Sequence, residues 1–298
     1  EEAAPSAVSA ASMGDGPPKA TRTVSAWRKG DALGAGSYGA VYKAFDQETL
    51  QIFAVKEVLV DGSDKQRERL STELRICQEL RHPNIVSCLG HDCTAERVFI
   101  YLEYMPCGSM ATMLAEFGAL AACPLRRATR DMFLGLAFLH TRSPPVVHRD
   151  LKGANLLVGT DMTVKLADFG CSKWSVETKS LTTLGSVPWM APEVISQAEG
   201  YGRKADIWSF GCTVIEMATG EQPWGRRAFD NMVFALHHIA NSSKTPPLPN
   251  SAPAACVDLI AQCVQRSQTR RPSTTELLRH TFLAPDAQRM TPGRHATV

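Results

Sequence analysis

The sequence predicts an α+β fold in two lobes, with a small β-rich N-lobe that carries one helix and a larger helical C-lobe. Three observations support this prediction. Short apolar runs separated by turns extend to about residue 102, a connector containing Pro and Gly follows at 103–108, and apolar residues then recur every three or four positions. A chain of 298 residues is long enough for one such two-lobed domain.

Composition excludes several classes of protein. A hydrophobic content of 44% and a charged content of 21% are ordinary for a globular protein. The net charge of +2 gives no basic footprint for nucleic acid or a membrane surface, so neither is expected as a partner. No apolar run approaches the roughly 20 residues that span a bilayer. Nine cysteines without paired spacing indicate free thiols in a reducing compartment, and we expect a cytoplasmic protein.

Domain limits follow from the same shifts in composition. Residues 1–25 are rich in Ala, Ser, Gly and Pro and are expected to be disordered, because they cannot bury enough apolar surface. The folded domain is expected at 26–283, with a polar tail at 284–298. Within it, the predicted parts are an N-lobe at 26–102, a hinge at 103–108 and a C-lobe at 109–283.

A glycine-rich loop opens the N-lobe, within a predicted β-meander over 27–60. The residues from Gly34 to Val41 spell Gly-x-Gly-x-x-Gly-x-Val. In a dinucleotide-binding turn, the alternative reading, these glycines would open a helix. Here alternating apolar residues, a turn and a second apolar run at 52–56 follow, which favours a flap over the phosphates of ATP. Glycines let backbone N–H groups approach phosphate oxygens closely.

A lysine follows this loop at the end of the second apolar run. Lys56, in Ala-Val-Lys, is placed to bind the α- and β-phosphates of ATP. Residues 65–81 have a helical rhythm and contain Glu73, the expected ion-pair partner of Lys56, with Glu79 as the competitor.

The connector after the strand at 98–102 is interpreted as a hinge. A β-hairpin loop is the alternative, but the change from strand-rich to helix-rich sequence favours the hinge. The main chain of Glu103 and Met105 would then hydrogen-bond adenine, and Leu102 would close the back of the adenine pocket.

The stretch from Val147 to Gly170 carries the strongest chemical signal. Asp150 and Asp168 stand 18 positions apart, with Lys152 and Asn155 between them. Apolar runs at 156–158 and 164–167, joined by a turn at 159–161, predict a hairpin that brings both carboxylates together. An amide and an ammonium beside two carboxylates can hold a divalent metal and a polyphosphate, leaving one carboxylate as a base.

A Ser/Thr-rich stretch at 174–184 is followed by a segment at 185–193 that ends in Ala-Pro-Glu. The distance from Asp-Phe-Gly to Ala-Pro-Glu is that of an activation segment, and Thr182, then Thr183, are its expected phosphorylation sites. A solvated Ser/Thr-rich loop is the alternative.

The C-lobe is predicted to continue with four helices. The helix at 204–219 is apolar on most faces and should be buried, with Asp206 accepting hydrogen bonds from the catalytic stretch and Gly220 ending it. Arg271 is placed to pair with Glu193. The others are expected at 229–240, 254–264 and 274–282, the last with a capping box from Ser273 and Glu276.

Together these motifs resemble the eukaryotic protein-kinase domain from residue 33 to residue 283. His-Arg-Asp-Leu-Lys-Gly-Ala-Asn at 148–155, through Lys152, resembles serine/threonine kinases. This segment, Leu-Ala-Asp-Phe-Gly-Cys-Ser-Lys at 166–173, Trp-Met-Ala-Pro-Glu-Val-Ile at 189–195 and Ile-Glu-Met-Ala-Thr-Gly-Glu-Gln-Pro-Trp at 215–224 are similar to mitogen-activated protein kinase kinase kinases. Ste20-like kinases share most of these sequence motifs and remain an alternative, as does a catalytically inactive kinase-fold scaffold.

The resemblance implies a function and a set of residues. It implies transfer of phosphate from ATP, with Mg²⁺, to Ser or Thr of a protein substrate, a mitogen-activated protein kinase kinase. Activation would come from an upstream kinase or from self-activation in trans, and the N-lobe helix would be regulatory. The implied catalytic residues are Lys56, Asp150, Lys152, Asn155 and Asp168, of which Asn155 and Asp168 bind the metal. The implied ATP contacts are Gly34, Ala35, Gly36, Ser37, Gly39, Val41, Ala54, Lys56, Glu73, Leu102, Glu103, Met105 and Leu157.

One departure from the family pattern concerns the end of the activation segment. The family commonly has Gly-Thr-Pro-Tyr-Trp-Met, and this chain has Gly-Ser-Val-Pro-Trp-Met at 185–190. Ser186 retains a hydroxyl that is expected to contact Asp150 and Lys152.

Overall fold

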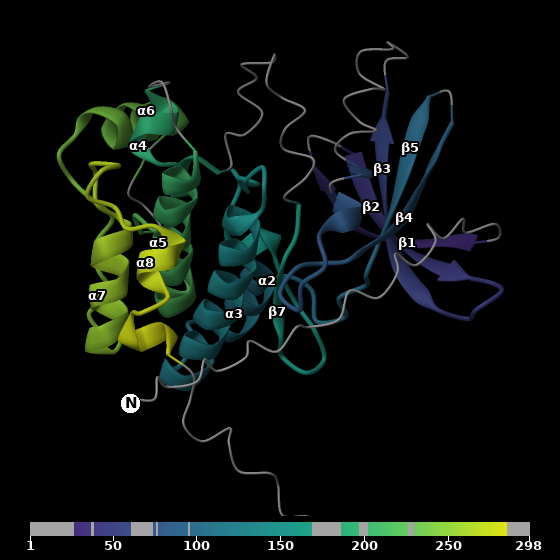
Figure 1. Ribbon diagram of the computed structural model, residues 1–298, viewed down its shortest axis with the longest axis horizontal. Coiled ribbons are helices and arrows are strands. Elements are labelled where there is room, and N and C mark those ends of the chain that lie inside the picture. The colour runs from purple at the N-terminus through teal and green to yellow at the C-terminus, as the bar shows by residue number, and fades with distance from the viewer. Residues whose placement is uncertain are drawn as a thin grey trace, which may run out of the picture.

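The computed structural model describes residues 27–36, 39–60, 74–75, 77–94, 96–168, 186–196, 202–225, 229 and 231–284. The predicted two-lobed α+β architecture is confirmed. In Figure 1 the strands of the N-lobe form one body, and the helices of the C-lobe form a second body beside it. Of the described helices, none is long and apolar enough to cross a membrane. The predictions for 1–25 and for nearly all of 284–298 lie outside the described residues.

The N-lobe contains a five-stranded antiparallel sheet in the order β1-β2-β3-β5-β4. The predicted meander of three strands is confirmed. Strand β4 was not predicted, because its sequence, Cys-Leu-Gly-His-Asp-Cys, lacks apolar alternation and its pairing with β5 is interrupted by a bulge between Cys88 and Gly90. The strands are β1 Trp27–Gly36, β2 Gly39–Asp46, β3 Ile52–Leu59, β4 Cys88–Cys93 and β5 Arg97–Leu102.

Strands β3 and β5 are packed on both faces. On one face Phe53 and Tyr101 meet edge to face, with ring centroids 5.4 Å apart. On the other face Val58 and Ile100 pack with Leu74. Leu74 belongs to the stretch predicted as a helix at 65–81, and residues 74–75 and 77–79 are helical. The helix therefore lies against the sheet.

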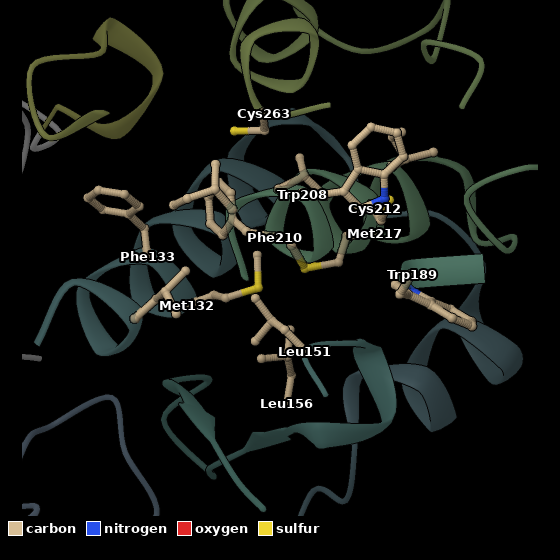
Figure 2. Close-up of a cluster of buried hydrophobic side chains, with 14 of the residues drawn as sticks. Met132, Phe133, Leu151, Leu156, Trp189, Trp208, Phe210, Cys212, Met217 and Cys263 are labelled. Atoms are coloured by element: carbon tan, nitrogen blue, oxygen red, sulfur yellow. The ribbon is translucent and has the colours of Figure 1, made fainter. Parts of the chain in front are cut away.

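The C-lobe is built around helix α5, Arg203–Thr219. Residues 205–218 of this helix are all buried, as its sequence predicted, and Gly220 ends it in a left-handed conformation with φ of 70°. Figure 2 shows Phe210 and Met217 among apolar side chains from other elements. The other helices are α2 Met110–Phe117, α3 Ala122–Thr141, α4 Pro192–Ile195, α6 Met232–Asn241, α7 Ala254–Cys263 and α8 Thr274–Leu277, with short 3-10 turns at Gly153–Asn155 and Thr281–Leu283.

The hairpin predicted in the catalytic stretch is confirmed. Strand β6, Leu156–Val158, pairs antiparallel with β7, Val164–Leu166. Leu156 is buried and, with Leu151, points into the cluster of Figure 2. The catalytic stretch is therefore anchored in the core of the C-lobe.

Two helix predictions need correction. The helix expected at 229–240 begins at Met232, because the Asn231 side chain accepts a hydrogen bond from the Phe234 N–H and caps the helix there. The helix expected at 274–282 has the predicted capping box but ends at Leu277. Beyond it, His280 accepts a hydrogen bond from the Phe282 N–H and starts a separate 3-10 turn.

Candidate active site

A cleft of about 380 Å³ lies between the sheet of the N-lobe and the hairpin of the C-lobe. Its walls come from β1, β2, β3, β5, the connector after β5, and the catalytic stretch. Lys56 and Asp168 therefore face the same cavity, as the sequence predicted. The predicted residues that line it are Gly34, Val41, Ala54, Lys56, Leu102, Glu103, Met105, Asn155, Leu157 and Asp168.

Three of the remaining predicted nucleotide contacts, Ala35, Gly36 and Gly39, lie at the tip of the β1–β2 hairpin. Gly36 pairs with Gly39 in register, and Ala35 belongs to β1. Gly39 has φ of 134°, and a Cβ there would lie 1.8 Å from the Glu57 carbonyl oxygen, so only glycine fits. Ser37 and Glu73 lie outside the described residues, so the predicted pair between Glu73 and Lys56 stays a prediction.

Lys56 joins the two lobes through an ion pair with Asp168. Its Nζ lies 2.5 Å from Asp168 Oδ1, although the residues are 112 positions apart. Lys56 is only 5% exposed, on β3 between Val41 of β2 and Ile100 of β5, whereas the Asp168 side chain is 45% exposed. Asp168 has φ of 61°, an unfavourable backbone conformation that presents its carboxylate to the cleft.

Asp150 lies at the centre of a polar network. Lys152 Nζ is 2.8 Å from one carboxylate oxygen and 3.1 Å from the other, and it also donates to Ser186 Oγ at 2.6 Å. Asn155 Nδ2 donates to Asp150 Oδ2 at 2.9 Å. Burial raises the pKa of the Asp150 carboxyl, but Lys152 and hydrogen bonds from Lys152, Ser186 and Asn155 outweigh burial, and the pKa lies below its ordinary value. Asp150 is therefore ionised at neutral pH.

Helix α5 fixes the backbone before Asp150. Asp206 accepts hydrogen bonds of 2.8 Å from the N–H groups of His148 and Arg149 and contacts His140 Nε2 at 2.8 Å. This confirms the predicted role of Asp206. Arg149 has φ of 70°, so these bonds hold the chain in a conformation that it would otherwise disfavour.

A second acidic residue of α5 was missed by the sequence analysis. Glu216 Oε2 accepts hydrogen bonds from the Gly153 N–H at 2.8 Å and from Trp189 Nε1 at 2.9 Å. Burial raises the pKa of this carboxyl, although both hydrogen bonds and Lys152 oppose the shift. A glutamate inside a helix that is otherwise almost wholly apolar was the available signal, since such residues are rarely buried without partners.

The donor set in the cleft fits a magnesium ion. Asn155 Nδ2 is used on Asp150, so its Oδ1 remains as an acceptor, and Asp168 Oδ2 lies beside the oxygen that pairs with Lys56. Mg²⁺ takes oxygen ligands and is commonly held by one or two protein side chains together with phosphates and waters. The described residues contain no group of three His, Cys, Asp or Glu that could hold a metal by themselves.

The comparisons with known proteins agree with this geometry. The family model for the protein kinase domain matches residues 27–283. The chain belongs to the protein kinase family. It is 39% identical to mitogen-activated protein kinase kinase kinase 3 of Arabidopsis thaliana over 94% of this chain, and 39% identical to mitogen-activated protein kinase kinase kinase A of Dictyostelium discoideum over 86%. It is 38% identical to human mitogen-activated protein kinase kinase kinase 19, again over 86%.

The kinase domain accounts for only part of these relatives. The chain spans 46%, 28% and 20% of the length of the three proteins, respectively. The likeness therefore concerns the catalytic domain.

Proposed function

We propose that this chain is a serine/threonine protein kinase that transfers phosphate from ATP to a mitogen-activated protein kinase kinase. The observation that carries the proposal is that Lys56, Asn155 and Asp168, from both lobes, line one cleft, while Asp150 and Lys152 are joined to them by the hydrogen bonds of Asp150 with Asn155 and Lys152. A catalytically inactive scaffold has no need to keep this set of charges together. The names of the relatives support the class of substrate.

Asp150 is proposed to act as the base. Its lowered pKa keeps the carboxylate ionised, and Asn155 and Lys152 fix its orientation, so that it can accept the proton of a substrate Ser or Thr hydroxyl. The contacts of Lys152 with both Asp150 and Ser186 support a role in stabilising the negative charge that would develop on the transferred phosphoryl group. Positioning and electrostatics do most of the work in phosphoryl transfer.

The nucleotide would bind in the cleft with its adenine at the connector after β5. The Glu103 N–H donates to the Ser87 carbonyl at 2.9 Å and the Met105 carbonyl accepts from the Gly108 N–H at 3.2 Å, so the Glu103 carbonyl and the Met105 N–H would serve adenine. Val41, Ala54 and Leu157 form apolar walls. Asn155 and Asp168 would hold Mg²⁺, which supplies charge neutralisation for the phosphates, and Lys56 would bind the α- and β-phosphates.

Regulation and location complete the proposal. Phosphorylation of Thr182 or Thr183, by an upstream kinase or in trans, would activate the chain; both residues lie outside the described residues, so the assignment rests on sequence. A reducing, cytoplasmic location is proposed because the described cysteines are free thiols.

The test is a transfer assay with labelled ATP and the purified chain. A mitogen-activated protein kinase kinase with its phosphoacceptor residues intact should be labelled, whereas the same protein with those residues changed to Ala should not. Lys56→Met and Asp150→Asn should each lower kcat by about 10²–10⁴-fold. Equal labelling of a generic basic protein would reject the substrate class, and no transfer to any substrate would reject the activity.

A further inference from the structure

A second cavity, of about 580 Å³, lies within the C-lobe and shares no lining residue with the cleft. It is formed where α3 ends, where α5 begins and by the segment that leads into α8. Three cationic side chains line it, Arg142, Arg203 and Lys204. Among the described residues no Asp or Glu does. The cavity therefore has a strongly positive wall.

None of the three cations forms an ion pair with a carboxylate within the described part of the chain. Arg203 Nη1 donates to the His140 carbonyl at 3.4 Å, and Lys204 Nζ donates to a backbone carbonyl. The Arg142 guanidinium lies 5.5 Å from the centre of the Phe138 ring. These contacts leave most of the N–H donors of the three groups unused by protein acceptors.

Two neighbouring carboxylates, Asp206 and Glu276, are engaged elsewhere. Asp206 accepts from His140 and from two backbone N–H groups of the catalytic stretch. Hydrogen bonds from Ser273, and to a smaller extent the charge of Lys204, lower the pKa of the Glu276 carboxyl. One oxygen of this carboxylate accepts from both the N–H and the hydroxyl of Ser273. Neither of these neighbours therefore forms an ion pair with a cation of the cavity.

The position of two of the cations in α5 is electrostatically unfavourable. Arg203 and Lys204 lie in the first turn of a 17-residue helix, where the helix dipole is positive and favours anions. Gly202, the residue before the helix, has no side chain to cap the first N–H groups. An anion in the cavity would remove this conflict.

We infer that this cavity binds a phosphate monoester. Arginine guanidinium groups make paired, charge-assisted hydrogen bonds to phosphate oxygens, and Arg142 and Arg203 approach the cavity from two different helix ends. Thr275, which is exposed, adds a hydroxyl donor. The volume exceeds that of one phosphate and admits part of the group that carries it. The source is either phosphoserine or phosphothreonine of a polypeptide, or a soluble ester such as an inositol phosphate.

The experiment measures binding directly and does not depend on catalysis. The full chain carries Lys56→Met in the other cavity, so that it adds no phosphate during the measurement. Fluorescence anisotropy follows a labelled phosphothreonine peptide, its unphosphorylated counterpart and labelled inositol hexakisphosphate. In the double variant that combines Arg142→Gln with Arg203→Gln, Kd for the probe that binds should rise by about tenfold or more.

A matched variant controls for net charge. The double variant Arg28→Gln with Arg81→Gln also removes two positive charges, but from exposed positions in the N-lobe, and it should change Kd by less than about twofold. Circular dichroism checks folding. If the double variant is unfolded, Arg142→Gln alone serves, because the Arg142 guanidinium lies over the Phe138 ring and makes no hydrogen bond to another described residue whose loss would matter to the fold.

The outcomes separate the two sources and can overturn the site. Binding of only the phosphorylated peptide, lost in the cavity variant, identifies a polypeptide, and binding of only the inositol phosphate identifies a soluble ester. Equal weakening in the cavity variant and the control variant would reduce the binding to general charge attraction and overturn the inference. Failure of all phosphorylated probes to bind would overturn it as well.

Discussion

Arg271 and Glu193, 78 residues apart, form a buried bidentate ion pair. Arg271 Nη1 lies 2.6 Å from Glu193 Oε1 and Nη2 lies 3.2 Å from Oε2. Arg271 also donates to the carbonyls of Lys204 and Gln265, so its charge is satisfied on several sides. The pair connects the segment before α8 to α4, which contains the last residue of the predicted activation segment, Glu193.

Removing one partner of this pair should strongly destabilise the domain. Glu193→Gln leaves the buried guanidinium without its counter-charge, and the expected loss is about 3–5 kcal/mol of the free energy of unfolding. Urea denaturation measures it. Arg97→Met, which breaks an ion pair with Glu57 at a side chain that is 48% exposed, is the control and should cost about 0–1 kcal/mol. Equal losses in the two variants would contradict the role of burial.

Gly153→Ala should destabilise the catalytic stretch. A Cβ at this position would lie 2.5 Å from Glu216 Oε1, so the carboxylate that holds the Gly153 N–H would have to move. The expected cost is about 1–3 kcal/mol in the free energy of unfolding. Gly34→Ala is the control, since a Cβ there meets nothing within 4 Å. The idea fails if both variants unfold at the same urea concentration.

Lys152→Ala should move the acidic limb of the pH–rate profile. Lys152 lowers the pKa of Asp150, so its loss raises that pKa, and the base is protonated at a higher pH. The limb of kcat should therefore shift upward, while kcat at neutral pH falls by about 10²–10³-fold. Lys165→Ala, which removes an ion pair with Glu103, should leave the limb in place. An unshifted limb in Lys152→Ala would show that Lys152 does not set this pKa.

Phe210→Ala should open a cavity in the core of the C-lobe. Phe210 is fully buried, and its ring meets Phe133 at 5.7 Å between centroids (Figure 2). The expected loss is about 3–5 kcal/mol, measured by urea denaturation. Phe117→Ala, at a side chain that is 73% exposed, should change stability by less than about 0.5 kcal/mol. Similar values for the two would refute this assignment of the core.

The sequence predicted the elements whose signal is local. Short apolar runs bounded by turns gave the first three strands and β5, a turn between two apolar runs gave the β6–β7 hairpin, and an almost wholly apolar stretch gave α5. The charged residues of the site, such as Asp150, Lys152 and Asp168, were also predicted, because carboxylates and cations that bind metal and phosphate recur at a characteristic spacing in one stretch of the sequence.

The elements that were missed depend on partners distant in sequence. Strand β4 is held by its pairing with β5 rather than by its own pattern. The end of α8 at Leu277 reflects tertiary bonds, since Arg126 of α3 donates to the carbonyls of Phe282 and Ala284 and fixes the chain outside the helix. Glu216 was missed because its partners, Gly153 and Trp189, approach it only in the folded chain.

Asp206 and Glu216 lie toward opposite ends of α5, and each accepts hydrogen bonds from backbone N–H groups of the catalytic stretch, on either side of Asp150. The relative positions of Asp150, Lys152 and Asn155 are thus set within the C-lobe alone, whereas Lys56 belongs to β3 of the N-lobe sheet. A rocking motion between the lobes would stretch or release the contact between Lys56 and Asp168 and leave Asp150, the proposed base, undisturbed. Admission of nucleotide and the chemical step are mechanically separable in this architecture.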